Sequence, residues 1–132
     1  MVRKKVVMYE SGENYLETIL ILKEKKGFVR AIDIAKELNF SKPSVSRAIG
    51  ILKETGHIIV DETGHIELTE QGTKKATEIY GRHKLLTKFL MEITKVTEDV
   101  AEEDACKMEH ILSDEVYSGI KKFMETIDIA QK

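Results

Sequence analysis

Residues 31–69 read AIDIAKELNFSKPSVSRAIGILKETGHIIVDETGHIELT, and this stretch decides the fold. Apolar residues at helical spacing predict a short helix from Ile32 to Leu38, followed by a tight break at Asn39-Phe40. A second helix is predicted from Ser41, a residue type that often caps helices, to Lys53. Pro43 falls in its first turn, where the missing N–H would have had no partner within the helix. The stretch therefore predicts two helices joined by a tight turn.

The last part of the same stretch changes from the period of a helix to that of a strand. Between His57 and Thr69, apolar residues alternate with polar ones on both sides of Glu62-Thr63-Gly64, which predicts a small β-hairpin. Two helices, a tight turn and then a hairpin follow one another in the order of a winged helix-turn-helix, a module that binds double-stranded DNA.

The second helix of this module has a surface suited to DNA. Its apolar residues, Val45, Ala48, Ile49 and Leu52, are expected to face inward, which leaves short polar groups around one long cation. Such a surface enters a major groove without clashing and reaches phosphates and base edges. An ordinary capped helix before an ordinary hairpin is the alternative. The residues predicted to contact DNA are Ser41, Lys42, Pro43, Ser44, Ser46 and Arg47, with Thr63, Gly64 and His65 at the hairpin tip; Arg3, Lys4 and Lys5 are expected either to touch phosphates or to fray.

Helical patterns flank the module on both sides. One helix is predicted from Gly12 to Lys26, and a long one follows the hairpin from Glu70, after a cap at Thr69, to Ile93. Two shorter helices are predicted over residues 98–112 and 114–127. The fold class is therefore mainly α, with a DNA-binding domain over residues 1–75 and a helical domain over residues 76–132, joined by the long helix.

Composition limits the class of protein. The chain has 132 residues, of which 42% are apolar and 33% charged, so it is too apolar for a disordered tail and too charged for a membrane span. Its single cysteine, Cys106, excludes an intramolecular disulfide and suits a reducing compartment. The basic start of the chain lacks the apolar stretch of a signal peptide, so a cytoplasmic location is expected.

A second set of residues has the chemistry of a metal site. On a helix, Cys106, Glu109 and His110 stand at positions i, i+3 and i+4, and Glu102 lies one turn before them. A thiolate, a carboxylate and an imidazole together suit Fe²⁺, Co²⁺, Ni²⁺ or Zn²⁺ better than Mg²⁺ or Ca²⁺. The alternative is that Cys106 is a small buried hydrophobic residue and that the spacing arose by chance.

An enzyme is the third class to consider, with Cys106 as nucleophile and His110 as its base. The sequence offers no glycine-rich oxyanion loop and no third catalytic group, and the DNA-binding and helical elements occupy the chain. We therefore expect no catalysis and no small-molecule substrate.

Several motifs, taken in order, have a familiar pattern. They are Glu13-Asn14-Tyr15-Leu16-Glu17-Thr18-Ile19, Asp33-Ile34-Ala35, Pro43-Ser44-Val45-Ser46, Leu68-Thr69-x-x-Gly72, Arg82-His83-x-Leu85-Leu86 and Asp104-Ala105-Cys106-x-x-Glu109-His110-x-x-Ser113-Asp114-Glu115. Over nearly its whole length the chain resembles the diphtheria toxin repressor family of metal-dependent transcriptional repressors. The resemblance implies a winged-helix domain, a helical dimerisation domain, a metal site between them, and repression of genes for iron or manganese uptake.

The resemblance also implies roles for particular residues. Cys106, Glu109 and His110 look like ligands of the principal metal site, and Asn14 stands where relatives have a Met or Asp ligand. Glu17 and His83 match ligand positions of the manganese-responsive branch, and His83 matches one of the iron-responsive branch as well. The chain departs from the iron-responsive branch at two positions of its ancillary site: Glu102 stands in place of a His, and Thr87 in place of a Glu.

We therefore expect a homodimeric, cytoplasmic repressor that binds a palindromic operator when loaded with metal. Fe²⁺ is the expected ion because Cys106 is a soft donor; Mn²⁺ is the alternative, and Co²⁺, Ni²⁺ or Zn²⁺ are expected to substitute in vitro. A winged-helix regulator that senses an organic ligand or nothing, with Cys106 structural, is the rival hypothesis. Residues expected in the dimer interface are Val100, Met108, Ile111, Leu112, Val116 and Ile120.

Overall fold

The structure, a computed structural model, describes the backbone of residues 2–131 and the side chains of residues 12–128. The elements along this part of the chain are α1 (Val2–Lys26), α2 (Ala31–Leu38), α3 (Lys42–Glu54), β1 (Ile58–Val60), β2 (Ile66–Leu68), α4 (Glu70–Thr94), α5 (Glu98–Met108) and α6 (Asp114–Gln131). The expected mainly α fold is confirmed. The chain divides into two compact units, Met1–Glu78 and Ile79–Lys132. Within the described residues, no helix is both long and apolar enough to span a bilayer.

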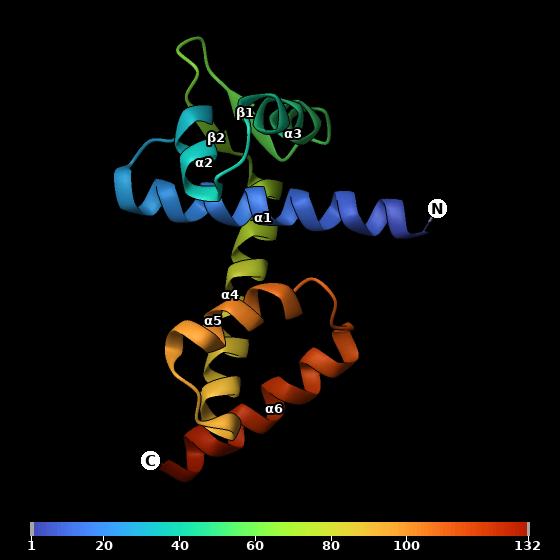
Figure 1. Cartoon of the computed structure of the whole chain (residues 1–132), viewed down its shortest axis with the longest axis vertical. Coiled ribbons are helices and arrows are strands. Elements are labelled where there is room, and N and C mark those ends of the chain that lie inside the picture. Colours follow the sequence, from blue (N-terminus) through green and yellow to red (C-terminus); the bar gives the residue numbers. More distant parts are fainter. Residues whose placement is uncertain (1, 132) are drawn as a thin grey trace. The chain divides into compact units, whose positions relative to one another are not determined.

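The first unit is a winged helix-turn-helix, as its helices α1 to α3 and the β1–β2 hairpin in Figure 1 show, and it is built around one apolar core. Helix α1 contributes one row of buried side chains, and α2, α3, both strands, the segment before α2 and the start of α4 contribute the rest. The members least exposed to solvent are Tyr15, Leu16, Ile19, Leu22, Val29, Ile34, Val45, Leu52, Ile58, Ile66 and Ala76. The core therefore joins α1 to the recognition helix α3 and to the wing, which is the β1–β2 hairpin.

The start of the recognition helix is the expected one. Asn39 ends α2 in the left-handed conformation at φ 56°, which turns the chain sharply. The Ser41 side chain then accepts a hydrogen bond from the N–H of Ser44 at 3.3 Å, so Ser41 caps α3. Val45 and Leu52 point into the core, as predicted from their spacing.

The wing is an antiparallel hairpin. Ile58 pairs with Leu68 and Val60 with Ile66. At its tip, one carboxylate oxygen of Asp61 accepts hydrogen bonds from the N–H groups of Thr63 and His65, both at 2.9 Å. Gly64 takes a φ of 88°, a conformation that favours glycine. The predicted hairpin and its turn are therefore confirmed.

Helix α4 begins in close contact with the chain that leads into the wing. The Thr69 hydroxyl accepts a hydrogen bond from the N–H of Gly72 at 3.0 Å, which confirms Thr69 as the cap, and donates one to the Gly56 carbonyl at 2.6 Å. A Cβ atom built on Gly72 would lie 1.9 Å from the carbonyl oxygen of His57. Only glycine fits at this point of the fold.

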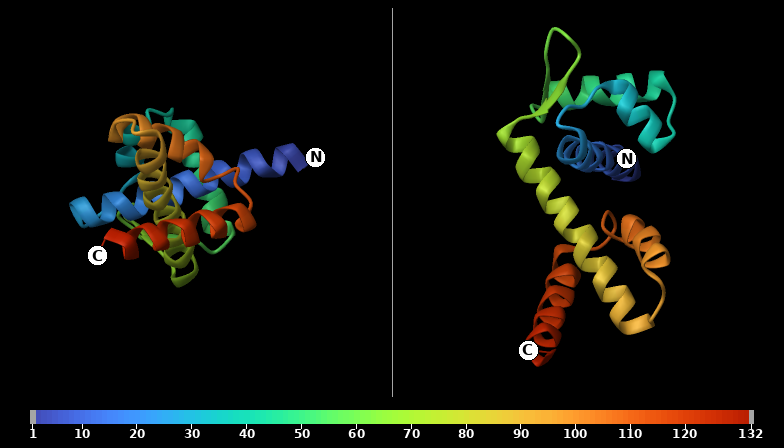
Figure 2. Two further views of the ribbon diagram at one scale, coloured as in Figure 1. Left: turned by 90° about the horizontal axis from the view of Figure 1, so that it is seen from below. Right: turned by 90° about the vertical axis from the view of Figure 1, so that its left-hand side faces the viewer.

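The second unit contains the C-terminal part of α4 together with α5 and α6 (Figure 2). Its buried apolar residues are Ile79, Leu86, Ala101, Ala105 and Met124. The ring of Phe89 on α4 meets the ring of Phe123 on α6 edge to face, with centroids 6.1 Å apart. This ring contact joins α6 to α4, while Ala101 and Ala105 are the buried residues of α5.

Three predicted helix ends are wrong. Helix α1 begins at Val2 and not at Gly12, because no helix-breaking residue intervenes and one internal glycine costs only about 1 kcal/mol relative to alanine. Helix α5 ends at Met108 and not at Leu112, because Ser113 accepts a hydrogen bond from the N–H of Val116 at 3.1 Å and so starts α6 afresh. Helix α6 continues to Gln131. The side chains of Arg3, Lys4 and Lys5, the proposed arm, lie outside the described residues.

Helix α2 is stabilised at its start by Asp33. One of its carboxylate oxygens accepts the N–H of Arg30 and the other accepts the Lys26 ammonium, each at 2.9 Å. The Lys26 hydrogen bond, followed by that from Arg30, holds the pKa of Asp33 below its ordinary value. Because the folded pKa is the lower one, Asp33 contributes stability above the ordinary pKa, and this contribution disappears as pH falls through the folded value.

Replacing Asp33 by alanine is expected to lower the free energy of unfolding by about 1 kcal/mol at pH 7, the usual cost of losing a helix cap. The difference from wild type should narrow as the pH falls below about 4. Urea denaturation at pH 7 and at pH 3 measures both values. Glu37→Ala, at an exposed position of the same helix, is the control, and an equal loss in the two variants would contradict the capping role.

Candidate metal centre

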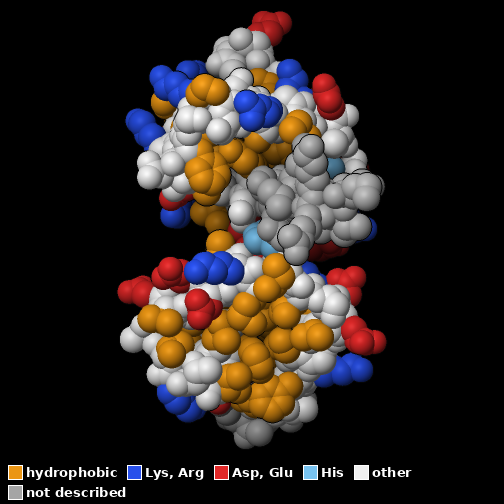
Figure 3. Space-filling view, turned by 45° about the vertical axis from the view of Figure 1, so that its right-hand side comes forward, with side chains coloured by type: hydrophobic (Ala, Val, Ile, Leu, Met, Phe, Trp, Pro, Cys, Tyr) orange, Lys and Arg blue, Asp and Glu red, His pale blue; other side chains and the backbone are white. Residues whose placement is uncertain are grey.

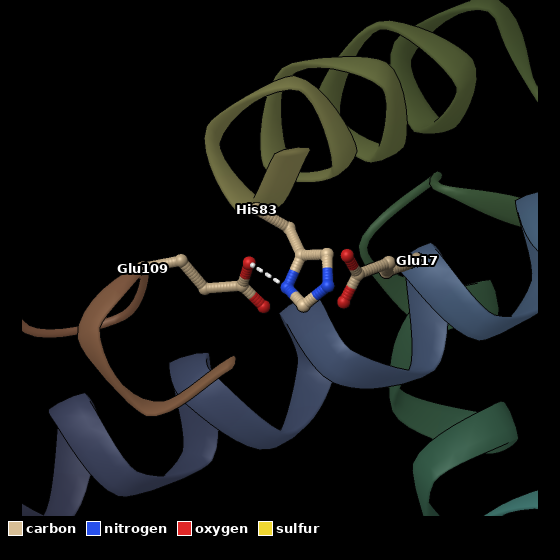
Figure 4. Close-up of side chains that lie close together, drawn as sticks. All are labelled: Glu17, His83 and Glu109. Atoms are coloured by element: carbon tan, nitrogen blue, oxygen red, sulfur yellow. Dashed lines mark ion pairs between the residues drawn. The ribbon is translucent and has the colours of Figure 1, made fainter. Parts of the chain in front are cut away.

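The side chain of Glu109 is fully buried although it carries a carboxyl group. It lies at the C-terminal cap of α5, with its N–H bonded to the carbonyl of Ala105. One carboxylate oxygen is 3.2 Å from Nδ1 of His83 on α4, an ion pair drawn as a dashed line in Figure 4, and the other is 3.3 Å from Nε2 of His110. All three residues belong to the second unit, so α4 and the end of α5 together build the cluster.

The two imidazoles decide the charge of this carboxyl group. Burial by itself raises the pKa of Glu109, but His110 and His83 lower it by more, so the pKa lies below its ordinary value. Glu109 is therefore an anion in a place where an unpaired anion would cost several kcal/mol. One anionic oxygen donor between two nitrogen donors is a set that fits a divalent transition metal.

Cys106 and Glu102 lie one turn apart on α5, and both are exposed. The described contacts bring Glu109 together with His83 and His110, while Cys106 lies one turn earlier on the helix. The roles of Cys106 and Glu102 as metal ligands stay predictions.

Two further predicted ligands, Asn14 and Glu17, lie on α1 of the first unit, one turn apart. Glu17 is buried and Asn14 is half-buried. Neighbouring Glu13 forms an ion pair with Lys75 at the start of α4, with 3.4 Å between the charged atoms. Their roles as ligands also stay predictions. In the second unit, Thr87 is buried. Its hydroxyl donates a hydrogen bond to the His83 carbonyl at 2.8 Å, one turn earlier on the same helix.

Sequence reasoning assigned no role to Arg82, although it quoted Arg82-His83 as a motif. Its guanidinium donates to the main-chain carbonyl of Glu109 at 3.1 Å and to the carboxylate of Asp114 at 2.8 Å. It also lies over the ring of Tyr117, 4.6 Å from the centroid. The available signal was a long cation directly before a candidate ligand on one helix, but its partners come from residues 27 to 35 positions later in the chain.

The predicted DNA-binding residues lie on the open face of the first unit. Six of them, Ser41, Lys42, Pro43, Ser44, Ser46 and Arg47, are exposed at the start and along the outer face of α3. At the wing tip, Thr63 is exposed, whereas Gly64 and His65 are half-buried. The ring of His65, at the wing tip, lies against the ring of Phe28, with centroids 5.7 Å apart. This contact joins the wing tip to the segment before α2.

Large apolar side chains are exposed on the second unit. Figure 3 shows apolar groups gathered on one of its faces. Val100, Ile111 and Val116, three of the residues predicted for the dimer interface, are 47%, 70% and 49% exposed. Met108, Leu112 and Ile120 are half-buried. An apolar surface of this kind is typical of a protein that buries it against a partner.

Comparison with known proteins gives consistent results for both units. Residues 8–66 match the model of the N-terminal DNA binding domain of iron dependent repressors, and residues 69–130 match that of their metal binding and dimerisation domain. The chain is 38% identical over 119 residues to an HTH-type transcriptional regulator of Methanocaldococcus jannaschii, a match that covers 89% of this chain and 95% of that one.

Two further proteins are longer than this chain. It is 28% identical over 120 residues to the diphtheria toxin repressor of Corynebacterium diphtheriae, covering 91% of this chain and 53% of the repressor. It is 30% identical to the manganese regulator SloR, whose structure it matches with a TM-score of 0.77 over 86% of this chain and 53% of that one. The chain therefore spans about half the length of these two relatives.

Proposed function

Since the chain belongs to the family of iron-dependent repressors, metal-dependent transcriptional regulators that bind DNA, we propose that it senses Fe²⁺ and represses genes of metal uptake. It acts in the cytoplasm as a homodimer on a palindromic operator. Mn²⁺ is the alternative activating ion, since a manganese regulator is among the similar structures. Its relatives are repressors and not enzymes, in agreement with the sequence.

The single observation that carries the metal assignment is the buried Glu109 carboxylate between two imidazoles. A divalent cation bound there would neutralise the buried anion and take up the nitrogen atoms of His83 and His110. Cys106 and Glu102 of α5, and Asn14 and Glu17 of α1, are the further proposed ligands. The metal would supply a link between α1 and the helices of the second unit.

The preference for Fe²⁺ rests on Cys106. A thiolate is the one soft donor in the proposed set, and the remaining carboxylates, amide oxygen and imidazoles are harder. Asn14 offers only a neutral oxygen, so the set carries less negative charge than one with an acid at that position.

The proposed link would set the separation of two recognition helices in the dimer. Half-sites of an operator lie about one helical turn of DNA, ~34–36 Å, or a multiple apart, so a small rigid-body change is enough to favour or prevent binding. Thermodynamic coupling of this kind is reciprocal, so operator DNA should also tighten metal binding.

Dimerisation is assigned to residues 76–132 and DNA binding to residues 1–75. The exposed apolar residues of the second unit support the first assignment, because a second copy would bury them. The exposed short polar groups of α3, with Arg47 among them, support the second.

Anaerobic titration of an operator tests the proposal. A duplex is first selected from a random pool by the Mn²⁺-loaded and by the Fe²⁺-loaded protein, and its binding is then measured with each ion and with a chelator. We expect the tightest binding with Fe²⁺ and none with the chelator. Binding that persists at full strength in the chelator would overturn the metal-sensing function and favour the regulator of an organic ligand.

Replacing Arg47 by alanine is expected to weaken operator binding by about 5- to 150-fold, which corresponds to the ~1–3 kcal/mol of a bidentate contact with guanine. Metal affinity should not change, because Arg47 lies on the outer face of α3. Lys53→Ala is the matched control, since it removes one exposed cation from the same helix. An equal loss in both variants would show that only charge matters, and no loss would remove Arg47 from operator recognition.

A further inference from the structure

Arg82 contacts the peptide group between two of the proposed metal ligands. The carbonyl oxygen of Glu109, which accepts its hydrogen bond at 3.1 Å, belongs to the peptide that joins Glu109 to His110. His83, whose imidazole meets the Glu109 carboxylate, is the next residue to Arg82 on α4. Arg82 is therefore adjacent in sequence to His83, and its guanidinium binds the main chain between Glu109 and His110.

The Glu109 carbonyl needs a donor at this place. Helix α5 ends at Met108, and a carbonyl beyond the end of a helix has no N–H of the next turn to bind. A cation is the favoured donor there because the helix dipole places partial negative charge at the C-terminal end. Arg82 supplies this donor from α4, so it ties the end of α5 to the helix that carries His83.

The other contacts of Arg82 hold its side chain in place. The guanidinium lies over the Tyr117 ring, and its second nitrogen contacts Asp114. Asp114 is fully exposed, so water screens this ion pair, and it adds little to the position of the site. The Arg82 side chain itself is only 19% exposed, and its remaining contacts are the stack on Tyr117 and the bond to the Glu109 carbonyl.

We propose that Arg82 is a positioning residue of the metal site, one that fixes Glu109 and His110 relative to His83 without contacting the ion. This inference rests on the proposed function. Outer groups that orient ligands typically change metal affinity by about 10- to 100-fold when they are removed. A guanidinium is also a positive charge near the site, so its removal by itself would raise the affinity for a cation. If removing Arg82 lowers the affinity for the metal ion, the lost charge cannot be the reason, because losing that charge would raise the affinity.

The test compares Co²⁺ binding by the full-length wild type and by Arg82→Met under anaerobic conditions. Affinity is measured by competition with a chromophoric chelator, and the absorption bands of bound Co²⁺ report the coordination geometry. We expect Arg82→Met to bind Co²⁺ at least about tenfold more weakly, with altered bands. Lys88→Met, which removes an exposed cation from the same helix, and Asp114→Asn are expected to bind as wild type does.

Thermal unfolding of the metal-free proteins separates positioning from support of the fold. A residue that only supported the fold would lower the melting temperature and leave Co²⁺ affinity unchanged at 10 °C, and that result would overturn the inference. If Arg82→Met does not fold, Arg82→Lys takes its place, because lysine keeps the charge without the planar fork. Wild-type affinity in a folded Arg82→Lys would then overturn the inference.

The test also distinguishes this inference from the function on which it rests. A wild type that binds Co²⁺ together with an Arg82→Met variant that binds it equally would refute Arg82 alone. A wild type that binds none of Co²⁺, Fe²⁺ and Mn²⁺ would refute the metal site and the role of Arg82 with it.

Discussion

Replacing Glu109 by glutamine is expected to abolish metal-dependent operator binding. The amide has the shape of the carboxylate but no charge, so the two imidazoles lose the anion between them. Loss of the only buried anion of the cluster should weaken metal binding by more than the ~10- to 100-fold that follows removal of an outer group. Equilibrium competition for Mn²⁺ and Co²⁺ gives the metal affinity, and a mobility shift at ion concentrations that saturate the wild type gives operator binding.

Glu103→Gln is the matched control, because it neutralises an exposed acid on α5, the helix that ends at Glu109. We expect this variant to bind metal and operator as the wild type does. Circular dichroism of the metal-free proteins establishes that both variants are folded. A folded Glu109→Gln protein that retained wild-type metal affinity would show that the cluster is a structural ion pair and that the ion binds elsewhere.

Replacing Gly72 by alanine should cause the largest loss of stability of any single methyl addition to the described glycines. The new Cβ would meet main-chain atoms of His57, which cannot rotate away as a side chain does. Overpacking usually costs ~1–3 kcal/mol, and a clash with backbone belongs at or above the upper end. The melting temperature should fall by roughly 10 °C or more. Operator binding should weaken as well, because the displaced main chain at His57 directly precedes β1 of the wing.

Gly81→Ala gives the comparison on the same helix. A Cβ at Gly81 would meet no atom within 4 Å, and alanine is the better helix former by about 1 kcal/mol. We therefore expect opposite signs, a lower melting temperature for Gly72→Ala and an equal or higher one for Gly81→Ala. Equal melting temperatures in the two variants would show that the contact at His57 relaxes without cost.

Local signals were sufficient to predict the DNA-binding unit. Ser41, Pro43 and Thr69 act through hydrogen bonds or dihedral angles confined to the next few residues, and the alternation around Gly64 reflects the pleat of a strand. Such patterns are present in the sequence itself. The early end of α5 was missed because the apolar pattern continues through Ile111 and Leu112, whereas the cap at Ser113 is a polar signal of the next helix.

The candidate metal centre was predictable only in its residue types. Helical spacing placed Cys106 and Glu109 on one face, yet Cys106 is exposed and Glu109 is almost completely buried. Two of the residues that contact Glu109, His83 and Arg82, come from another helix. Contacts between helices that are distant in sequence leave no periodic trace, so neither the depth of the carboxylate nor the role of Arg82 could be derived from spacing.

The position of α1 within the first core has a mechanical consequence. Leu16 and Ile19, on either side of Glu17, are packed in the same interior as Val45 and Leu52 of the recognition helix. A close-packed interior has low compressibility, so a displacement of α1 is transmitted to the elements packed on the other side of the core. The winged-helix unit is therefore expected to move as one body, with α1 and the recognition helix keeping their relative positions.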